Sequence, residues 1–193
     1  MNMTIYTLDE HDPGHPSFEK FGPHCIRGSW GAKLRPDLAI AKGARFIRKG
    51  HRLDTDGFDA FEDDDLADLL RDHGIQDIVV MGVCLEYCVK ATTLGALKNG
   101  FTPIVILDCC YPADPSTTYE TLNVLMSNGA HVCHSGDIPP HIDLPYNTAL
   151  MIIDVQNDFF YGTGPNQFRG ALPIIGGEAI IPRINEVLQR HDS

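Results

Sequence analysis

Four side chains that can do chemistry each follow a short apolar run of the sequence: Asp9, Lys49, Cys88 and Asp154. Their chemistry is complementary, because a thiol can act as a nucleophile, a carboxylate can transfer protons and an ammonium supplies positive charge. Each would lie at the carboxyl end of a strand or in the turn just after it, where open parallel sheets bind ligands. One such residue alone is more typical of a surface turn. Four such residues together, with complementary chemistry, favour a functional site.

Cys88 is the candidate nucleophile. It comes after the run IVVMGV and a short turn, and it opens a predicted helix, so its sulfur is expected at the N-terminus of that helix. There the helix dipole favours the thiolate, and backbone N–H groups can hold a developing oxyanion. Cys84 lies before the helix, and its side chain is interpreted as structural. The CxxxC spacing fits neither a zinc knuckle nor a redox pair.

The segment LDEHDPGHPSFEKFGPH (8–24) contains a carboxylate and three imidazoles that could bind a metal ion. Asp9 and His11 alternate, so both can point to one side of an extended strand end. His15 and His24 follow in a loop rich in Pro and Gly that can fold back over them. Such ligands suit zinc, manganese or iron. Because the chain has nine histidines, a polar surface loop is an equally good interpretation of this segment alone.

Asp154 closes the hydrophobic run of MIIDVQNDFF, and Lys49 lies in FIRKGH. Partial burial would raise the pKa of Asp154 and suit it to proton transfer, and Lys49 could supply a positive charge beside it. The alternatives are that Asp154 caps the next turn and that the Lys49 ammonium reaches solvent.

Six apolar runs of strand length must position these side chains, and helical patterns lie between them. Most of the runs are continuous rather than alternating, which is typical of parallel strands covered on both faces. They are 3–8, 44–49, 77–83, 102–107, 130–134 and 148–155, and the helical patterns are 66–74, 88–100, 116–129 and 180–190. The alternation predicts an α/β fold, a three-layer α/β/α sandwich with a mainly parallel six-stranded sheet, in one domain spanning 1–193.

The order of these elements is unusual at the two ends of the chain. Helix 180–190 has no strand after it, and strand 3–8 has no helix before it. A right-handed crossover from strand 148–155 needs a third element, and strand 3–8 fits that place. We therefore expect a circularly permuted fold, in which residues 136–147 join the former ends and residues 1 and 193 lie close together. Strand 3–8 should then pair with strand 148–155 and bring the metal cluster within about 10 Å of the Cys88 sulfur.

The composition argues against several classes of function. With 26 acidic and 15 basic residues the formal charge is −11, which disfavours nucleic-acid binding. No apolar stretch approaches the about 18 residues of a membrane span, and the amino terminus lacks the features of a secretory signal. Several of the six cysteines lie in apolar runs and are expected to be reduced. We therefore expect a cytoplasmic protein without nucleic-acid or membrane partners.

Through these residues the sequence resembles the isochorismatase-like cysteine hydrolase superfamily, and within it the nicotinamidase/pyrazinamidase branch. The matching pieces are ALMIIDVQNDFF (149–160), LPIIGGEAIIPRINEVL (172–188), LDEHDPGHPSF (8–18), GPHCIRGSWGAKL (22–34), IRKG (47–50) and VVMGVCLEYCVKATTLGAL (79–97). The order differs from that of the family, because the IDVQNDF piece opens such proteins but here follows the cysteine motif. The turn CLEYC also differs from the more common ATDYC.

The resemblance implies roles for individual residues. It implies a catalytic triad of Asp154, Lys49 and Cys88, and an oxyanion hole made by the N–H groups of Cys84 and Cys88 after a cis peptide at Val83–Cys84. It implies metal ligands Asp9, His11 and His24, with His15 as a neighbour that could also bind. Phe159 matches an aromatic residue that stacks on the substrate ring, and Phe21 stands where many relatives carry Trp.

The resemblance also implies an activity. It indicates a metal-dependent amidohydrolase that converts nicotinamide to nicotinate and ammonia through an acyl-thioester on Cys88, as in NAD salvage. The expected cofactor is a divalent metal ion, zinc first, with manganese or iron as alternatives, and the expected assembly is a homo-oligomer acting on a small amide. Two other interpretations stay open: an amidase of the same superfamily for another small amide or ureide, and a catalytically inactive metal-binding relative.

Overall fold

The computed structural model describes residues 3–62, 65–137, 147–162 and 169–191. Its centre is a sheet of six strands, all parallel, in the order β2-β1-β6-β3-β4-β5. The strands are β1 (Met3–Asp9), β2 (Arg45–Lys49), β3 (Asp77–Val83), β4 (Thr102–Tyr111), β5 (His131–Cys133) and β6 (Thr148–Ile153). Every residue of the central strand β6 is buried, as expected of a continuous apolar strand covered on both faces.

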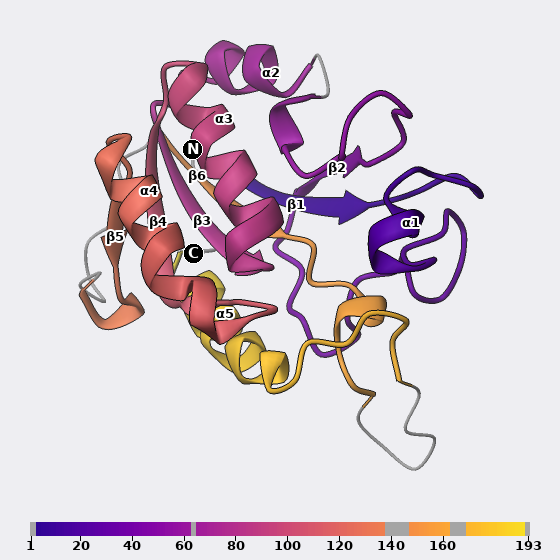
Figure 1. Ribbon diagram of the computed structural model, residues 1–193. Coiled ribbons are helices and arrows are strands. Elements are labelled where there is room, and N and C mark those ends of the chain that lie inside the picture. The colour runs from indigo at the N-terminus through magenta and orange to yellow at the C-terminus, as the bar shows by residue number, and fades with distance from the viewer. Residues whose placement is uncertain (1–2, 63–64, 138–146, 163–168, 192–193) are drawn as a thin grey trace.

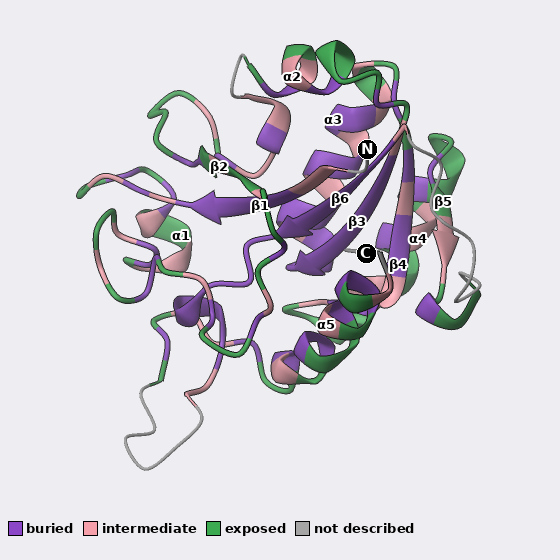
Figure 2. Ribbon diagram, turned by 180° about the vertical axis from the view of Figure 1, so that it is seen from behind, coloured by how far each residue is buried: buried purple, intermediate pink, exposed green. Residues whose placement is uncertain are grey.

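Helices cover both faces of the sheet (Figure 1). The longer helices are α2 (Leu66–Asp72), α3 (Lys90–Lys98), α4 (Thr118–Ser127) and α5 (Ile180–His191), and α1 (Phe18–Phe21) is a single turn. Alternate residues of β3 separate the two cores: Val79 and Met81 pack with α5, whereas Ile78 and Val80 pack on the side of α2, α3 and α4. The predicted three-layer α/β/α sandwich is therefore confirmed, and Figure 2 shows its buried centre.

β1 lies between β2 and β6 in the sheet, so one of its two neighbours comes from a distant part of the chain. It pairs with β6 in parallel, with Met3 opposite Ala149 and Tyr6 opposite Ile152. The predicted pairing of strand 3–8 with strand 148–155 is thus confirmed. Residues 1 and 193 and most of the joint at 136–147 lie outside the described residues, so the circular permutation itself stays a prediction.

The strand ends that carry the candidate site residues meet at one edge of the sheet. β1 ends at Asp9, β2 ends at Lys49, and Asp154 follows the end of β6. Beyond β3 the chain passes through the cis peptide Val83–Cys84, as the resemblance implied. Among the described residues no helix is long and apolar enough to cross a membrane.

Candidate active site

Lys49 and Asp154 form a buried ion pair at the carboxyl edge of the sheet. Lys49 Nζ lies 2.7 Å from Asp154 Oδ2, and the two side chains are 1% and 0% exposed. Burial raises the pKa of Asp154, and the Lys49 ammonium offsets that rise only in part. Burial alone would lower the pKa of Lys49, but the two carboxylates Asp154 and Asp9 outweigh it and raise that pKa well above its usual range. Lys49 therefore stays charged, whereas Asp154 is suited to accept a proton.

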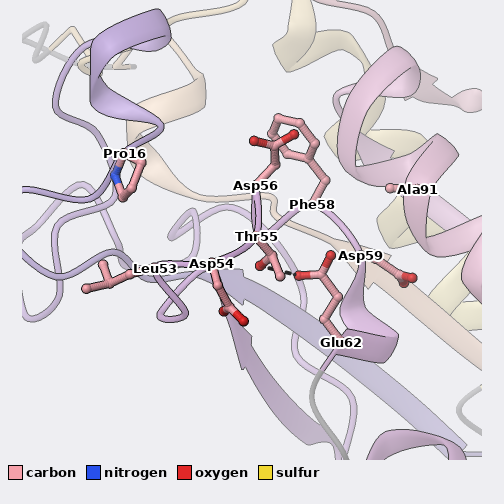
Figure 3. Close-up of a pocket in the computed structure, with 9 residues that line it drawn as sticks. All are labelled: Pro16, Leu53, Asp54, Thr55, Asp56, Phe58, Asp59, Glu62 and Ala91. Carbon is pink, nitrogen blue, oxygen red and sulfur yellow. Dashed lines mark hydrogen bonds between the residues drawn. The ribbon is translucent and has the colours of Figure 1, made fainter.

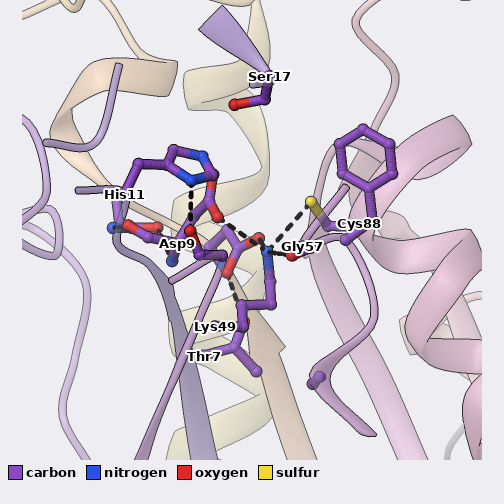
Figure 4. A network of polar contacts seen from close by, with 12 residues as sticks. Thr7, Asp9, His11, Ser17, Lys49, Gly57 and Cys88 are labelled. Atoms are coloured by element: carbon purple, nitrogen blue, oxygen red, sulfur yellow. Dashed lines mark hydrogen bonds and ion pairs between the residues drawn. The ribbon is translucent and has the colours of Figure 1, made fainter. Parts of the chain in front are cut away.

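The thiol of Cys88 faces the same ammonium. Lys49 Nζ lies 3.4 Å from Cys88 Sγ (Figure 4). Burial raises the pKa of Cys88 well above its usual range, and the nearby Lys49 reduces this effect without reversing it. Burial thus opposes the thiolate that a helix dipole is expected to favour at Cys88. The cysteine lies inside a π-helical turn at Leu85–Val89, ahead of α3.

Three predicted metal ligands come together beside this pair. Asp9 Oδ2 lies 2.8 Å from His11 Nε2 and 3.5 Å from His24 Nε2, and one ligand atom from each residue lies within 4.8 Å of the other two. Burial raises the pKa of Asp9, but Lys49 and hydrogen bonds from the two histidines outweigh it and hold that pKa far below its usual range. Burial lowers the pKa of His24, but the hydrogen bonds to Asp9 and Gly22 raise it overall.

The orientation of the two imidazoles fits a cation. His11 Nδ1 lies 2.7 Å from the Gly50 carbonyl and His24 Nδ1 lies 2.8 Å from the Gly22 carbonyl. A carbonyl oxygen only accepts hydrogen bonds, so both Nδ1 atoms carry a proton, and Nε2 is the nitrogen of each ring that lies beside Asp9. In the part of the chain that the structure describes, buried His11 Nε2 has no hydrogen bond of normal geometry. Two imidazole nitrogens beside one carboxylate oxygen are a donor set that suits a divalent metal ion.

His15 lies next to this group but does not point its ring nitrogens into it. Its ring stacks on that of His11 at a centroid distance of 4.3 Å. Its Nδ1 lies 2.8 Å from Ser17 Oγ, and its Nε2 donates to the Arg52 carbonyl at 2.8 Å. The structure therefore brings together three of the four predicted ligands, with His15 behind His11.

The metal group and the thiol share one cavity, of about 270 Å³. Lys49 Nζ lies 3.4 Å from Asp9 Oδ1 and 3.4 Å from Cys88 Sγ, so the two sites are well within the about 10 Å expected for neighbouring strands. Asp9, His24 and Cys88 line the cavity together with aromatic side chains, which are Phe21, Phe58, Tyr87 and Phe159. A hollow of this size with aromatic walls and a few polar groups suits one small planar ring.

Both predicted substrate-binding residues are in the cavity wall. The Phe21 ring packs edge-on against Phe58 and Tyr87, at centroid distances of 6.0 and 5.4 Å, and the Phe159 ring lies 6.0 Å from His24. Phe58 and Tyr87 are wall residues that the sequence reasoning missed. No pattern marks them, because a loop brings Phe58 to the cavity.

Two buried polar residues also escaped the sequence reasoning. The Gln156 side chain accepts from the backbone N–H of Asp9 and donates to the backbone carbonyl of Asp9, each at 2.8 Å. It therefore fixes the end of β1 to the chain after β6. Thr7 bonds to Asp154. Gln156 lay within the quoted motif IDVQNDF, and Thr7 lay in the predicted strand 3–8, where a period of two places it on the same side as Asp9.

A second, more open hollow of about 510 Å³ lies beyond Phe58 (Figure 3). Its lining is acidic, with Asp54, Asp56, Asp59 and Glu62. None of the candidate catalytic residues lines it, so the chemistry is concentrated in the cavity of Cys88.

Comparisons with known proteins agree with this geometry. The family model for the isochorismatase domain matches residues 2–137. A nicotinamidase of Escherichia coli is 41% identical over 93 residues, which are 45% of this chain and 44% of that protein. A nicotinamidase of Saccharomyces cerevisiae is 29% identical over 143 residues, 67% of this chain and 66% of that protein. The chain thus spans between 44% and 66% of the length of these two curated relatives.

Two solved structures have a fold similar to that of this chain. The pyrazinamidase of Pyrococcus horikoshii in complex with zinc is 32% identical, with a TM-score of 0.63 over 68% of this chain and 75% of that chain. A protein of L. infantum in complex with nicotinate is 29% identical, with a TM-score of 0.65 over 77% of this chain and 74% of that chain. Since the family match covers well over half of the residues, the chain belongs to the isochorismatase family.

Proposed function

We propose that this protein is a metal-dependent cysteine amidohydrolase that converts nicotinamide to nicotinate and ammonia. The observation that carries the proposal is the position of Lys49, whose ammonium contacts Asp154, Cys88 and Asp9 at once. This contact joins a nucleophile, a proton acceptor and a metal-binding group in one small aromatic cavity. The activity of the relatives named nicotinamidases supports the choice of amide.

Asp154, Lys49 and Cys88 would form the catalytic triad. Asp154 takes the proton of the Cys88 thiol, and the sulfur attacks the carboxamide carbon to form the C–S bond. The backbone N–H groups of Cys84 and Cys88 hold the oxyanion. Asp154 then gives its proton to the leaving nitrogen, and ammonia departs as the C–N bond breaks. The product of this half-reaction is an acyl-thioester on Cys88.

The second half-reaction uses the same residues. Asp154 takes a proton from water, whose oxygen attacks the thioester carbon. As the C–S bond breaks, the Cys88 sulfur regains a proton and nicotinate is released. Lys49 keeps its charge throughout and balances the negative charge that moves between Asp154 and Cys88.

Asp9, His11 and His24 would hold the divalent metal ion, for which we propose zinc, with His15 packed behind His11. When bound, the ion supplies Lewis acidity that can hold a ring nitrogen or a water molecule. Phe159 and Phe21 would stack on and enclose the ring. We further propose a cytoplasmic homo-oligomer that acts in NAD salvage.

An amidase for another small amide or ureide is the second candidate. The observation that favours it is the position of Glu86, in the unusual turn CLEYC. Its carboxylate accepts from the backbone N–H groups of Ala113 and Asp114, at 3.1 and 2.7 Å. Ala113 lines the cavity, so the unusual turn CLEYC shapes the wall. A panel of nicotinamide, pyrazinamide and N-carbamoyl compounds separates the two candidates, because only the second predicts that a compound without a pyridine or pyrazine ring is the best substrate.

Ammonia release from nicotinamide by the metal-loaded protein tests the main proposal. Cys88→Ala should lower kcat by about 10⁴-fold or more because the nucleophile is gone, whereas Cys84→Ala should keep kcat within about 10-fold because Cys84 contributes only its backbone N–H. Circular dichroism checks that both variants fold. Equal losses in the two folded variants would contradict the assignment of Cys88, and no ammonia from any amide would favour an inactive relative.

A further inference from the structure

Thr7 is a fully buried residue of β1 whose side chain contacts Asp154 in two ways. Its hydroxyl donates to Asp154 Oδ1 at 2.5 Å, and its Oγ1 accepts the backbone N–H of Asp154 at 3.2 Å. A hydroxyl has one proton to donate and lone pairs to accept. Thr7 therefore binds the carboxylate and the backbone of one residue at the same time.

The backbone of Asp154 needs such support. Its φ is +51°, in the left-handed region that favours glycine. The bond from Asp154 N–H to Thr7 holds one side of this residue. On the other side its carbonyl accepts from Gln156 N–H at 2.8 Å. The direction in which the Asp154 side chain leaves the backbone thus depends on Thr7.

The two oxygens of Asp154 have different partners. Oδ1 accepts from Thr7, whereas Oδ2 lies 2.7 Å from Lys49 Nζ. Lys49 Nζ is also 3.4 Å from Cys88 Sγ, so Oδ2 and the sulfur contact the same ammonium. The terminal torsion of an aspartate is broad, so an ion pair alone would leave the plane of the carboxylate free to turn. The hydrogen bond from Thr7 fixes that plane and occupies one of the two oxygens.

We propose that Thr7 is a positioning residue that occupies Oδ1 of Asp154 and so makes Oδ2 the oxygen that takes the Cys88 proton. In this step the S–H bond breaks, an O–H bond forms at Oδ2, and Thr7 keeps its own proton. The inference rests on the proposed function in assigning proton transfer to Asp154. It adds a residue that touches neither the substrate nor the metal ion.

Thr7→Val tests the inference, because valine keeps the branched shape and lacks the hydroxyl, and Thr7→Ser is its matched control. Thr7→Val should lower kcat for nicotinamide by about 10- to 100-fold with KM changed less than about 3-fold, as expected when a hydrogen bond to a charged group is lost. Thr7→Ser should stay within about 3-fold of the unmodified protein in both constants. A rise in KM at constant kcat, or an equal loss of kcat in Thr7→Ser, would overturn the inference.

A second measurement does not need the amide substrate. The rate at which iodoacetamide alkylates Cys88, followed by mass spectrometry, should fall in Thr7→Val by about the same factor as kcat, while half-buried Cys133 reacts at an unchanged rate. If the unmodified protein does not hydrolyse nicotinamide but this difference is found, the proposed function fails and the positioning role stands. Unchanged alkylation of Cys88 in folded Thr7→Val would overturn the inference. Thr7→Ala replaces Thr7→Val if the latter does not fold, and failure of both to fold while Thr7→Ser folds would also overturn it.

Discussion

Lys49 places one buried positive charge among groups that come from four parts of the chain. Its Nζ lies 2.7 Å from Asp154, 3.4 Å from Asp9, 3.4 Å from Cys88 and 3.1 Å from the carbonyl of Gly57. An ion that has lost its water must be compensated by neighbours of opposite charge and by hydrogen-bond acceptors. Because one cation compensates both carboxylates, the candidate metal ligands and the proposed triad are electrostatically coupled.

The metal site gives a prediction for single residues. His11→Ala and His24→Ala should each reduce the bound metal after dialysis at least about 10-fold, because each removes one of three ligands. His15→Ala is the matched control. Its ring nitrogens are bonded to Ser17 and to the Arg52 carbonyl, so this variant should keep its metal.

Elemental analysis of the three purified variants provides the measurement. Unchanged metal content in both His11→Ala and His24→Ala would remove the proposed site. Equal loss in His15→Ala would make His15 a ligand and would require its ring to turn away from Ser17.

The sequence predicts site residues well where local pattern decides them. Asp9 and His11 share a side because a strand alternates with a period of two. The high pKa of the Cys88 thiol could not be predicted, because burial depends on the packing of distant segments. The same holds for Thr7, since a threonine in a strand is common and only the position of β6 gives it a partner.

At the level of elements, the continuous apolar runs predicted all six strands, although not all their ends. β4 runs to Tyr111 rather than to residue 107, because its pairing with β3 shifts register between Val80 and Gly82. At Gly82 a side chain would lie 2.1 Å from the carbonyl oxygen of Ile153, so only glycine allows β3 and β6 to approach there. A shift of this kind depends on neighbouring strands and is not visible in one segment.

Helix ends differ for a similar reason. Residues 88–100 were expected as one helix, but α3 begins at Lys90 after the π-helical turn. The carbonyl of Cys84 accepts from both Tyr87 N–H and Val89 N–H, at 3.1 and 3.2 Å. The bond from Val89 spans five residues and winds the chain more widely just where Cys88 must face the cavity, and helical propensity alone does not predict that widening.

The short 3₁₀ turn at Ala60–Glu62 gives a prediction at the level of elements. Burial raises the pKa of Asp59, the residue just before this turn, to about 6, above its value of about 3.9 in the unfolded chain. The stability that Asp59 contributes is thus fully present below about pH 4 and is lost as the pH rises through about 6. Asp59→Asn should therefore raise the free energy of unfolding at pH 8 by up to about 3 kcal/mol and change it little near pH 4.

The asparagine introduced by Asp59→Asn can keep the acceptor that Asp59 Oδ1 offers to the N–H of Phe61, at 2.9 Å. It also has the same size as the aspartate, whose carboxylate packs against Gly95. Urea unfolding of both proteins across this pH range measures the difference. A variant that is equally or less stable at pH 8 would show that the burial of Asp59 does not govern its protonation.

At the scale of the whole molecule, β1 and β6 are partners across the middle of the sheet although they lie at opposite ends of the sequence. The hydrogen bond from Thr7 to Asp154 spans 147 positions, so the site forms only when these strands pair. The entropic cost of closing such a loop rises only with the logarithm of its length. The family match covers residues 2–137 and leaves the IDVQNDF piece outside it. Both observations support our proposal that the chain is a circular permutant joined near residues 136–147.

Reversing the permutation tests that proposal. The reordered chain begins at residue 147 and runs to residue 193. A Gly/Ser linker of about 12 residues then leads to residue 1, and the chain ends at residue 137. This order keeps every described strand and helix intact. Such a linker spans about 20 Å on average, and it converts the β1–β6 pairing into a nearby connection. Because the same contacts form and loop entropy changes slowly with length, its free energy of unfolding should stay within about 1–2 kcal/mol of that of the original chain, and its kcat for nicotinamide within about 3-fold.

The control is the original chain with the same linker inserted after residue 142, which tests tolerance of the joint without moving the ends. Urea unfolding, bound metal and ammonia release are measured on both. If the reordered chain does not fold while the control does, the described strands depend on the present order of the chain, and the proposal of a permuted family fold is wrong.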